Sequence, residues 1–197
     1  MNDDFDLSGM VGKLTMSLGG GNNVIVVDAV TGDLGLTTVG GNDGVTLTDI
    51  TGATTLTLGN GNNSVSLINN QASGAVTITS GADTDDITLE NVAGQFSQTV
   101  TLTLGAGDNT ITATTIVGDL DVIGTDGVDD LTLTDIGGAI SANLGAENNN
   151  VRLTNAVLLS DSVNLTTSSG IDVIDLTGVE GNLTLTLGSG DNAVTID

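Results

Sequence analysis

The chain has 197 residues, 29 of them glycine, and it contains no proline, cysteine, histidine, tryptophan or tyrosine. Its 25 acidic residues are opposed only by Lys13 and Arg152, so the formal net charge is −23. This charge argues against nucleic acid and anionic membranes as partners, and no apolar run is long enough for membrane insertion. Without cysteine or histidine, disulfides, thiolate metal sites and an ordinary nucleophile–base pair are impossible, so we expect no enzyme.

The chain begins with an acidic segment, residues 1–11, that has the pattern of half a repeat unit. Residues 12–197 then form nine repeat units, the last of them incomplete. Each unit opens with an alternating strand, such as "LTLTL" at 183–187, and passes through a turn rich in Gly, Asn and Asp. A second short strand follows, such as "VTI" at 194–196. The units start near Gly12, Gly32, Gly52, Gly74, Gln98, Gly118, Gly138, Asp161 and Gly181.

A constant interval separates the two strands of every unit. The first inward residue of the opening strand precedes that of the second strand by 11 positions, as from Leu14 to Ile25. The return to the next unit varies in length, because three units carry extra residues there. Insertions at one corner are typical of loops that leave a stacked array. We expect Phe96 and the "AVLL" at 156–159, which lie in these insertions, to cover a strand edge, with a partner contact as the alternative.

These features predict an all-β chain that forms a single parallel β-solenoid of about nine coils, with 20–24 residues per coil. A unit this short cannot bury its own apolar face, whereas stacked units bury a continuous core. The alternative is a β-sandwich, which would not predict the same interval in every unit.

A second pattern doubles the repeat to a pair of coils, about 42 residues long. The last inward residue of the opening strand is leucine in one coil and a small residue, Thr, Ser or Gly, in the next. Large residues stacked on small ones fill a core without voids. This column contains Leu18, Thr38, Leu58, Ser80, Leu104, Gly124, Leu144, Thr167 and Leu187.

An asparagine–aspartate column runs through the turns. Two residues before the first inward position of the second strand, every unit carries Asn or Asp, and the two types alternate. Such short polar side chains bond to nearby backbone and fix turns. Their oxygens also suit Ca²⁺, so calcium binding by this column is the second interpretation. The column, which Asp3 continues upstream, contains Asp3, Asn23, Asp43, Asn63, Asp85, Asn109, Asp129, Asn149, Asp172 and Asn192.

The turns resemble those of RTX-type Ca²⁺-binding β-rolls, whose nonapeptide is G-G-x-G-x-D-x-U-x. In "GSGDNAVT" at 188–195, Gly188 and Gly190 match its second and fourth positions, Asn192 its aspartate and Val194 its apolar residue. Leu187 replaces its first glycine, and the motif recurs once per coil instead of every nine residues. As a whole, the chain is similar to the β-solenoid arrays of bacterial surface and secreted proteins. That resemblance implies an extracellular or cell-surface location and a structural or adhesive role.

We therefore expect a non-enzymatic structural or adhesive module, stabilised by Ca²⁺ and able to stack end to end, because the terminal coils show no capping pattern. The sequence does not identify a carbohydrate or surface partner. The alternative is an ice-binding protein that uses an outward Thr-x-Thr ladder, as at Thr55 and Thr57. Threonine is also the default exposed strand residue, and Asp121 and Ile123 interrupt the ladder, which argues against an ice-binding face.

Overall fold

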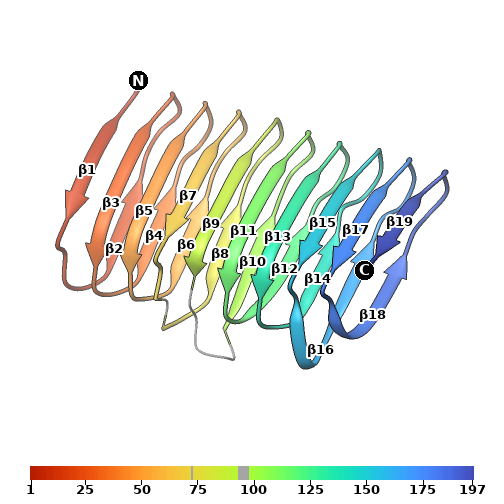
Figure 1. The fold of residues 1–197 in the computed structure, drawn as a ribbon. Helices are drawn as coiled ribbons and strands as arrows, with labels where there is room; N and C mark the ends of the chain where they lie inside the picture. Colours follow the sequence, from red (N-terminus) through yellow and green to blue (C-terminus); the bar gives the residue numbers. More distant parts are fainter. Residues whose placement is uncertain (72, 93–97) are drawn as a thin grey trace.

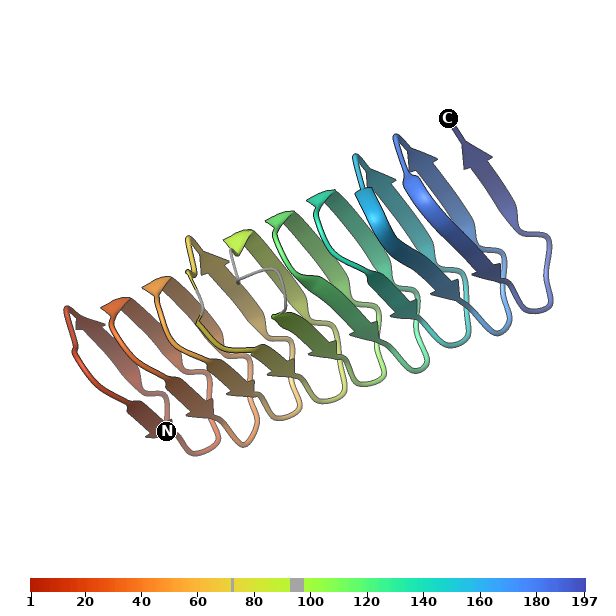
Figure 2. The same ribbon diagram turned by 90° about the horizontal axis from the view of Figure 1, so that it is seen from below.

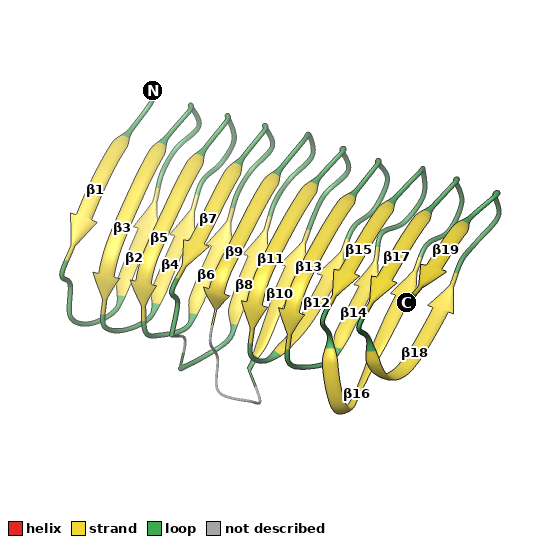
Figure 3. Ribbon diagram, in the orientation of Figure 1, coloured by secondary structure: helices red, strands yellow, loops and turns green. Residues whose placement is uncertain are grey.

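The computed structural model describes residues 1–71, 73–92 and 98–197, with residues 157–161 as backbone only. These residues form a flattened parallel β-solenoid, in which successive strands fall alternately into two facing sheets (Figures 1 and 3). The two termini lie at opposite ends of the resulting rod (Figure 2). Phe96 and the side chains at 157–159 lie outside the described residues, so the expected covering of a strand edge stays a prediction.

Both sheets are entirely parallel within the described residues, as the predicted solenoid requires. The nine-stranded sheet contains the opening strands β2 (Leu14–Ser17), β4 (Leu34–Thr37), β6 (Thr54–Thr57), β8 (Val76–Thr79), β10 (Thr99–Thr103), β12 (Asp119–Ile123), β14 (Ile140–Asn143), β16 (Val157–Thr166) and β18 (Glu180–Thr186). The ten-stranded sheet contains β1 (Asp4–Ser8), β3 (Val24–Val30), β5 (Gly44–Ile50), β7 (Ser64–Ile68), β9 (Asp86–Val92), β11 (Thr110–Ile116), β13 (Asp130–Ile136), β15 (Asn150–Thr154), β17 (Val173–Thr177) and β19 (Ala193–Ile196).

The strand register confirms the predicted inward columns. Leu14 pairs with Leu34 in one sheet, and Ile25 pairs with Val45 in the other, as the constant interval requires. Apolar residues from both sheets meet in one continuous core that runs the length of the rod. Within it, buried Thr38 and Ser80 alternate with the buried leucines Leu58 and Leu104, so large and small residues interlock between coils.

The corner that follows the second strand was not predicted. Here one residue per coil adopts a left-handed conformation, including Ala29 at φ 55° and Thr115 at φ 59°. The turn it makes directs the next residue back into the core, so buried Val30 and Ile116 extend their strands beyond the expected length. This third inward column includes one polar member, Asn70, whose Oδ1 accepts the backbone N–H of Ile50 at 2.9 Å.

The opposite corner is narrow because adjacent coils approach closely there. Gly41, at φ 113°, lies so near the carbonyl of Gly21 that a Cβ at Gly41 would overlap it. The same arrangement recurs at Gly61, whose added Cβ would overlap Gly41. At these two positions glycine is therefore favoured by both conformation and space, and this corner carries the asparagine–aspartate column.

Candidate functional site

The ten predicted column residues line up at the narrow corner that joins the two sheets. Each lies immediately before a strand of the ten-stranded sheet, and most lie two residues after a corner glycine. Asp83 and Glu147 replace that glycine in two coils. The eight interior members are at most 2 % exposed, so the column lies inside the rod. The two terminal members, Asp3 and Asn192, are half-buried because a coil covers them on one side only. The structure thus brings all ten residues into a single buried ladder.

Backbone N–H groups connect every rung of this ladder to the next. The N–H of Asn23 donates to Oδ1 of Asp43 at 2.9 Å, and the N–H of Asp43 donates to Oδ1 of Asn63 at 3.1 Å. The same bond recurs at every step from Asp3 to Asn192. Each side-chain oxygen therefore satisfies a backbone donor that the tight corner leaves without a strand partner.

The second hydrogen-bonding group of each side chain explains why the two residue types alternate. Nδ2 of Asn23 donates to Oδ1 of Asp43 at 2.7 Å and to the carbonyl of Gly21 at 3.1 Å. Nδ2 of Asn109 likewise donates to Oδ1 of Asp129 at 3.0 Å and to the carbonyl of Gly107. A carboxylate cannot donate, so the asparagine rungs supply donors and the aspartate rungs accept them.

The other carboxylate oxygen of each aspartate lies on the side of the column of alternating large and small residues, and in one coil it bonds to that column. Oδ2 of Asp172 accepts the Thr167 hydroxyl at 2.8 Å within the same coil. At the equivalent place beside Asp129 stands Gly124, where an added Cβ would lie 2.5 Å from Oδ2 of Asp129. A leucine there would occupy the space of the carboxylate. Aspartate therefore occurs in coils with a small residue, and asparagine in coils with leucine.

Burial raises the pKa of Asp85 and of Asp129, because it removes the charged carboxylate from water. Hydrogen bonds from Asn63 and Asn109 lower these two pKa values, but by less than burial raises them. The Ser80 hydroxyl also favours ionised Asp85, although it does not meet Oδ2 in hydrogen-bond geometry. Among the described side chains, Oδ2 of Asp85 has no hydrogen-bond partner. The folded state therefore favours proton uptake at these rungs.

The ladder supplies few ligands for calcium. Ca²⁺ takes about six to eight oxygen ligands, whereas Oδ1 of Asp43 already accepts two N–H groups from Asn23. Successive carboxylates are separated by an asparagine rung, which leaves at most one uncommitted oxygen in every second coil. Within the described residues, no three acidic side chains are grouped to hold a metal ion. As folded, the ladder does not fit a calcium site, and calcium binding stays a prediction.

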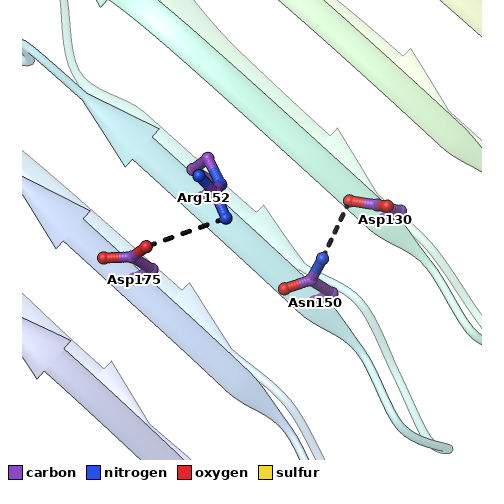
Figure 4. Close-up of polar contacts among 4 residues, drawn as sticks. All are labelled: Asp130, Asn150, Arg152 and Asp175. Carbon is purple, nitrogen blue, oxygen red and sulfur yellow. Dashed lines mark hydrogen bonds and ion pairs between the residues drawn. The ribbon is translucent and has the colours of Figure 1, made fainter.

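Outward polar contacts are weaker than those of the ladder. On the face of the ten-stranded sheet, Nη2 of Arg152 lies 3.9 Å from Oδ2 of Asp175, and Asn150 donates to Asp130 at 3.2 Å (Figure 4). The side chains of Arg152 and Asp175 are 61 % and 37 % exposed, and ion pairs on the surface contribute about 0–1 kcal/mol. The buried ladder, not the outer face, is therefore the chain's distinctive polar feature.

Comparison of the chain with protein-family models, curated proteins and solved structures finds no match. The chain is therefore classified by its fold alone, as a parallel β-solenoid repeat protein. Across residues 1–71, 73–92 and 98–197, no helix has the length and apolarity that a membrane crossing requires.

Proposed function

We propose that the chain is a non-enzymatic structural module, a stiff β-solenoid rod that spaces or assembles other parts of a cell surface or extracellular structure. The ladder carries this proposal, because the chain places its regularly repeated polar residues inside the rod, where they join coil to coil. A binding protein or enzyme would instead present such residues at an open site. The similarity to surface and secreted solenoid arrays supports the extracellular, adhesive part of the proposal.

Self-association end to end is part of the proposed role. The last coil exposes the edges of β18 and β19, and the first exposes the edges of β1 and β2 (Figure 2). Open parallel edges present unpaired N–H and C=O groups that favour strand addition. The charge of −23 opposes this contact, so salt or Ca²⁺ should favour it by screening the exposed carboxylates.

Small-angle scattering over a range of protein and salt concentrations tests the proposal. We expect an elongated particle whose length grows with concentration in high salt, while its cross-section stays constant. A particle that thickens as it grows would contradict stacking, and a strict monomer under all these conditions would contradict self-association.

Ice binding is the second candidate, favoured by one observation. Thr55, Thr77 and Thr101 pair in register on the outer face of the nine-stranded sheet, and a second threonine column, which begins at Thr37, runs beside them. The ladder covers only a few rungs before Asp121 interrupts it. Ice crystals grown in the protein should therefore show neither shaping nor thermal hysteresis, and either effect would make this the better proposal.

A further inference from the structure

We propose that copies of this chain dock head to tail through the buried ladder, with Asn192 of one copy meeting Asp3 of the next. The junction would reproduce the step from Asn149 to Asp172. In that step the backbone N–H and Nδ2 of Asn149 both donate to Oδ1 of Asp172, at 3.0 and 3.2 Å. This inference rests on the proposed self-association and specifies its partner, its polarity and its register.

The two terminal rungs carry complementary free groups. Oδ1 of Asn192 accepts the N–H of Asp172 at 2.9 Å, but no described residue accepts the backbone N–H or Nδ2 of Asn192. At the other end, the N–H of Asp3 donates to Oδ1 of Asn23 at 3.0 Å, while no described group donates to the Asp3 carboxylate. Two donors thus remain at one end and their acceptor at the other.

A second, exposed ladder is formed by the residues that immediately precede the column residues, and it fits the same junction. Its backbone N–H groups donate to the preceding coil, whereas those of the buried ladder donate to the following coil. The N–H of Asn22 donates back to Oδ1 of Asn2 at 2.9 Å, and the N–H of Val128 donates back to Oδ1 of Asp108 at 2.9 Å. In the proposed junction, the N–H of Asn2 would donate to the carboxylate of Asp191. The ends therefore match in two adjacent columns of opposite hydrogen-bond direction.

The strand register of this junction also covers exposed apolar surface. Continuing the parallel pairing places Phe5 of the second copy beside Val194, and its Leu7 beside Ile196. Val194 and Ile196 belong to inward columns yet are 42 % and 57 % exposed, because no coil covers them. Phe5 and Leu7 are only half-buried at their own end. Docking would cover these four side chains within the ten-stranded sheet and remove apolar surface from water, although the strand missing opposite Phe5 and Leu7 leaves that side open.

The ladder also specifies polarity. Two copies joined at their N-terminal ends would oppose one Asp3 carboxylate to another, and two joined at their C-terminal ends would oppose the donors of one Asn192 to those of another. Only the head-to-tail arrangement pairs donors with an acceptor. One sheet has ten described strands and the other nine. When β1 of the second copy pairs with β19, a gap the width of one strand therefore remains between β18 and the second copy's β2. The junction is thus closed on one side only, which predicts weak, reversible association.

Cysteine cross-linking tests the register, because the chain has no cysteine of its own. The junction pairs the outward residues Thr195 and Asp6, whose Cα atoms would lie about 4.8 Å apart, within disulfide range. The variant Thr195→Cys/Asp6→Cys should give a ladder of disulfide-linked oligomers on mild oxidation in high salt. The control Thr195→Cys/Asp4→Cys removes the same charge but places the cysteines two residues out of register, so it should give few. Equal cross-linking of both variants, or of neither, would overturn the junction.

Sedimentation of alanine variants separates the junction from self-association in general. Asp4 is the exposed neighbour of Asp3, and Asp4→Ala should strengthen association slightly by lowering the net charge. Asp3→Ala removes the same charge together with the proposed acceptor, and it should weaken association at least tenfold. If the parent chain associates but both variants strengthen it, self-association stands and the ladder junction is wrong. If the parent chain never associates, the proposed self-association is itself wrong, and the junction fails with it.

Discussion

Replacement of Asn109 by aspartate tests the division of the ladder into donor and acceptor rungs. The change is isosteric and keeps Oδ1, but it removes the Nδ2 bonds to Asp129 at 3.0 Å and to the Gly107 carbonyl at 2.9 Å. It also places three buried carboxylates on consecutive rungs, about 4.8 Å apart. The lost hydrogen bonds, one of them to a charged group, and the added repulsion should together cost about 3–5 kcal/mol at neutral pH.

The reverse substitution one rung along, Asp129→Asn, is the matched control. It keeps the Oδ1 acceptor and removes a buried charge, so the free energy of unfolding should change by about 1 kcal/mol or less. Urea unfolding followed by circular dichroism measures both variants. The loss in Asn109→Asp should shrink in mild acid as the new carboxyl group is protonated. Equal losses in the two variants at neutral pH would refute the donor–acceptor account.

Three further predictions follow from the same structure. Because burial raises the folded-state pKa of Asp85 and Asp129, the folded chain binds more protons, so stability should rise as pH falls from neutrality toward about 4; Asp129→Asn should flatten this rise in urea titrations. Thr115→Asn should raise the free energy of unfolding by about 1 kcal/mol, since Thr115 is a β-branched residue at φ 59°, whereas Thr114→Asn should not. If calcium only screens exposed acids, Ca²⁺ and Mg²⁺ should raise Tm equally, and saturable, Ca²⁺-selective heat in calorimetry would instead show a built site.

The register and the inward columns were predictable because both depend on a strict spacing. Leu14 and Ile25 begin series whose members share apolar character, and the asparagine–aspartate column keeps its residue types in every coil. The left-handed corner carries a weaker signal. Most of its residues are Asn, Asp or Gly, as at Asp49 and Asn91, and these types favour that conformation. Ala29 and Thr115 adopt it without such a preference, because stacking against neighbouring coils sets their conformation.

The contact between the asparagine–aspartate column and the column of alternating large and small residues could be found only from the structure. Thr167 and Asp172 are five positions apart in the sequence, and their contact depends on how the narrow corner folds back on itself. Each column alternates visibly by itself, but only the close approach of Asp129 to Gly124 explains why they alternate together. Asn70 lies in an insertion of irregular length, so its burial could not be predicted from the strand spacing.

Deletion of whole coils tests most directly the claim that alternating rungs hold this rod together. Removal of residues 32–51 excises one coil and stacks Leu18 on Leu58, and Asn23 on Asn63, so like meets like in both columns. Removal of residues 12–51 excises two coils and stacks Asp3 on Asn63, which preserves the alternation. We predict that the two-coil deletion, although shorter, unfolds cooperatively and at a higher Tm than the one-coil deletion. A one-coil deletion as stable as the two-coil deletion would contradict the central role of the alternating ladder.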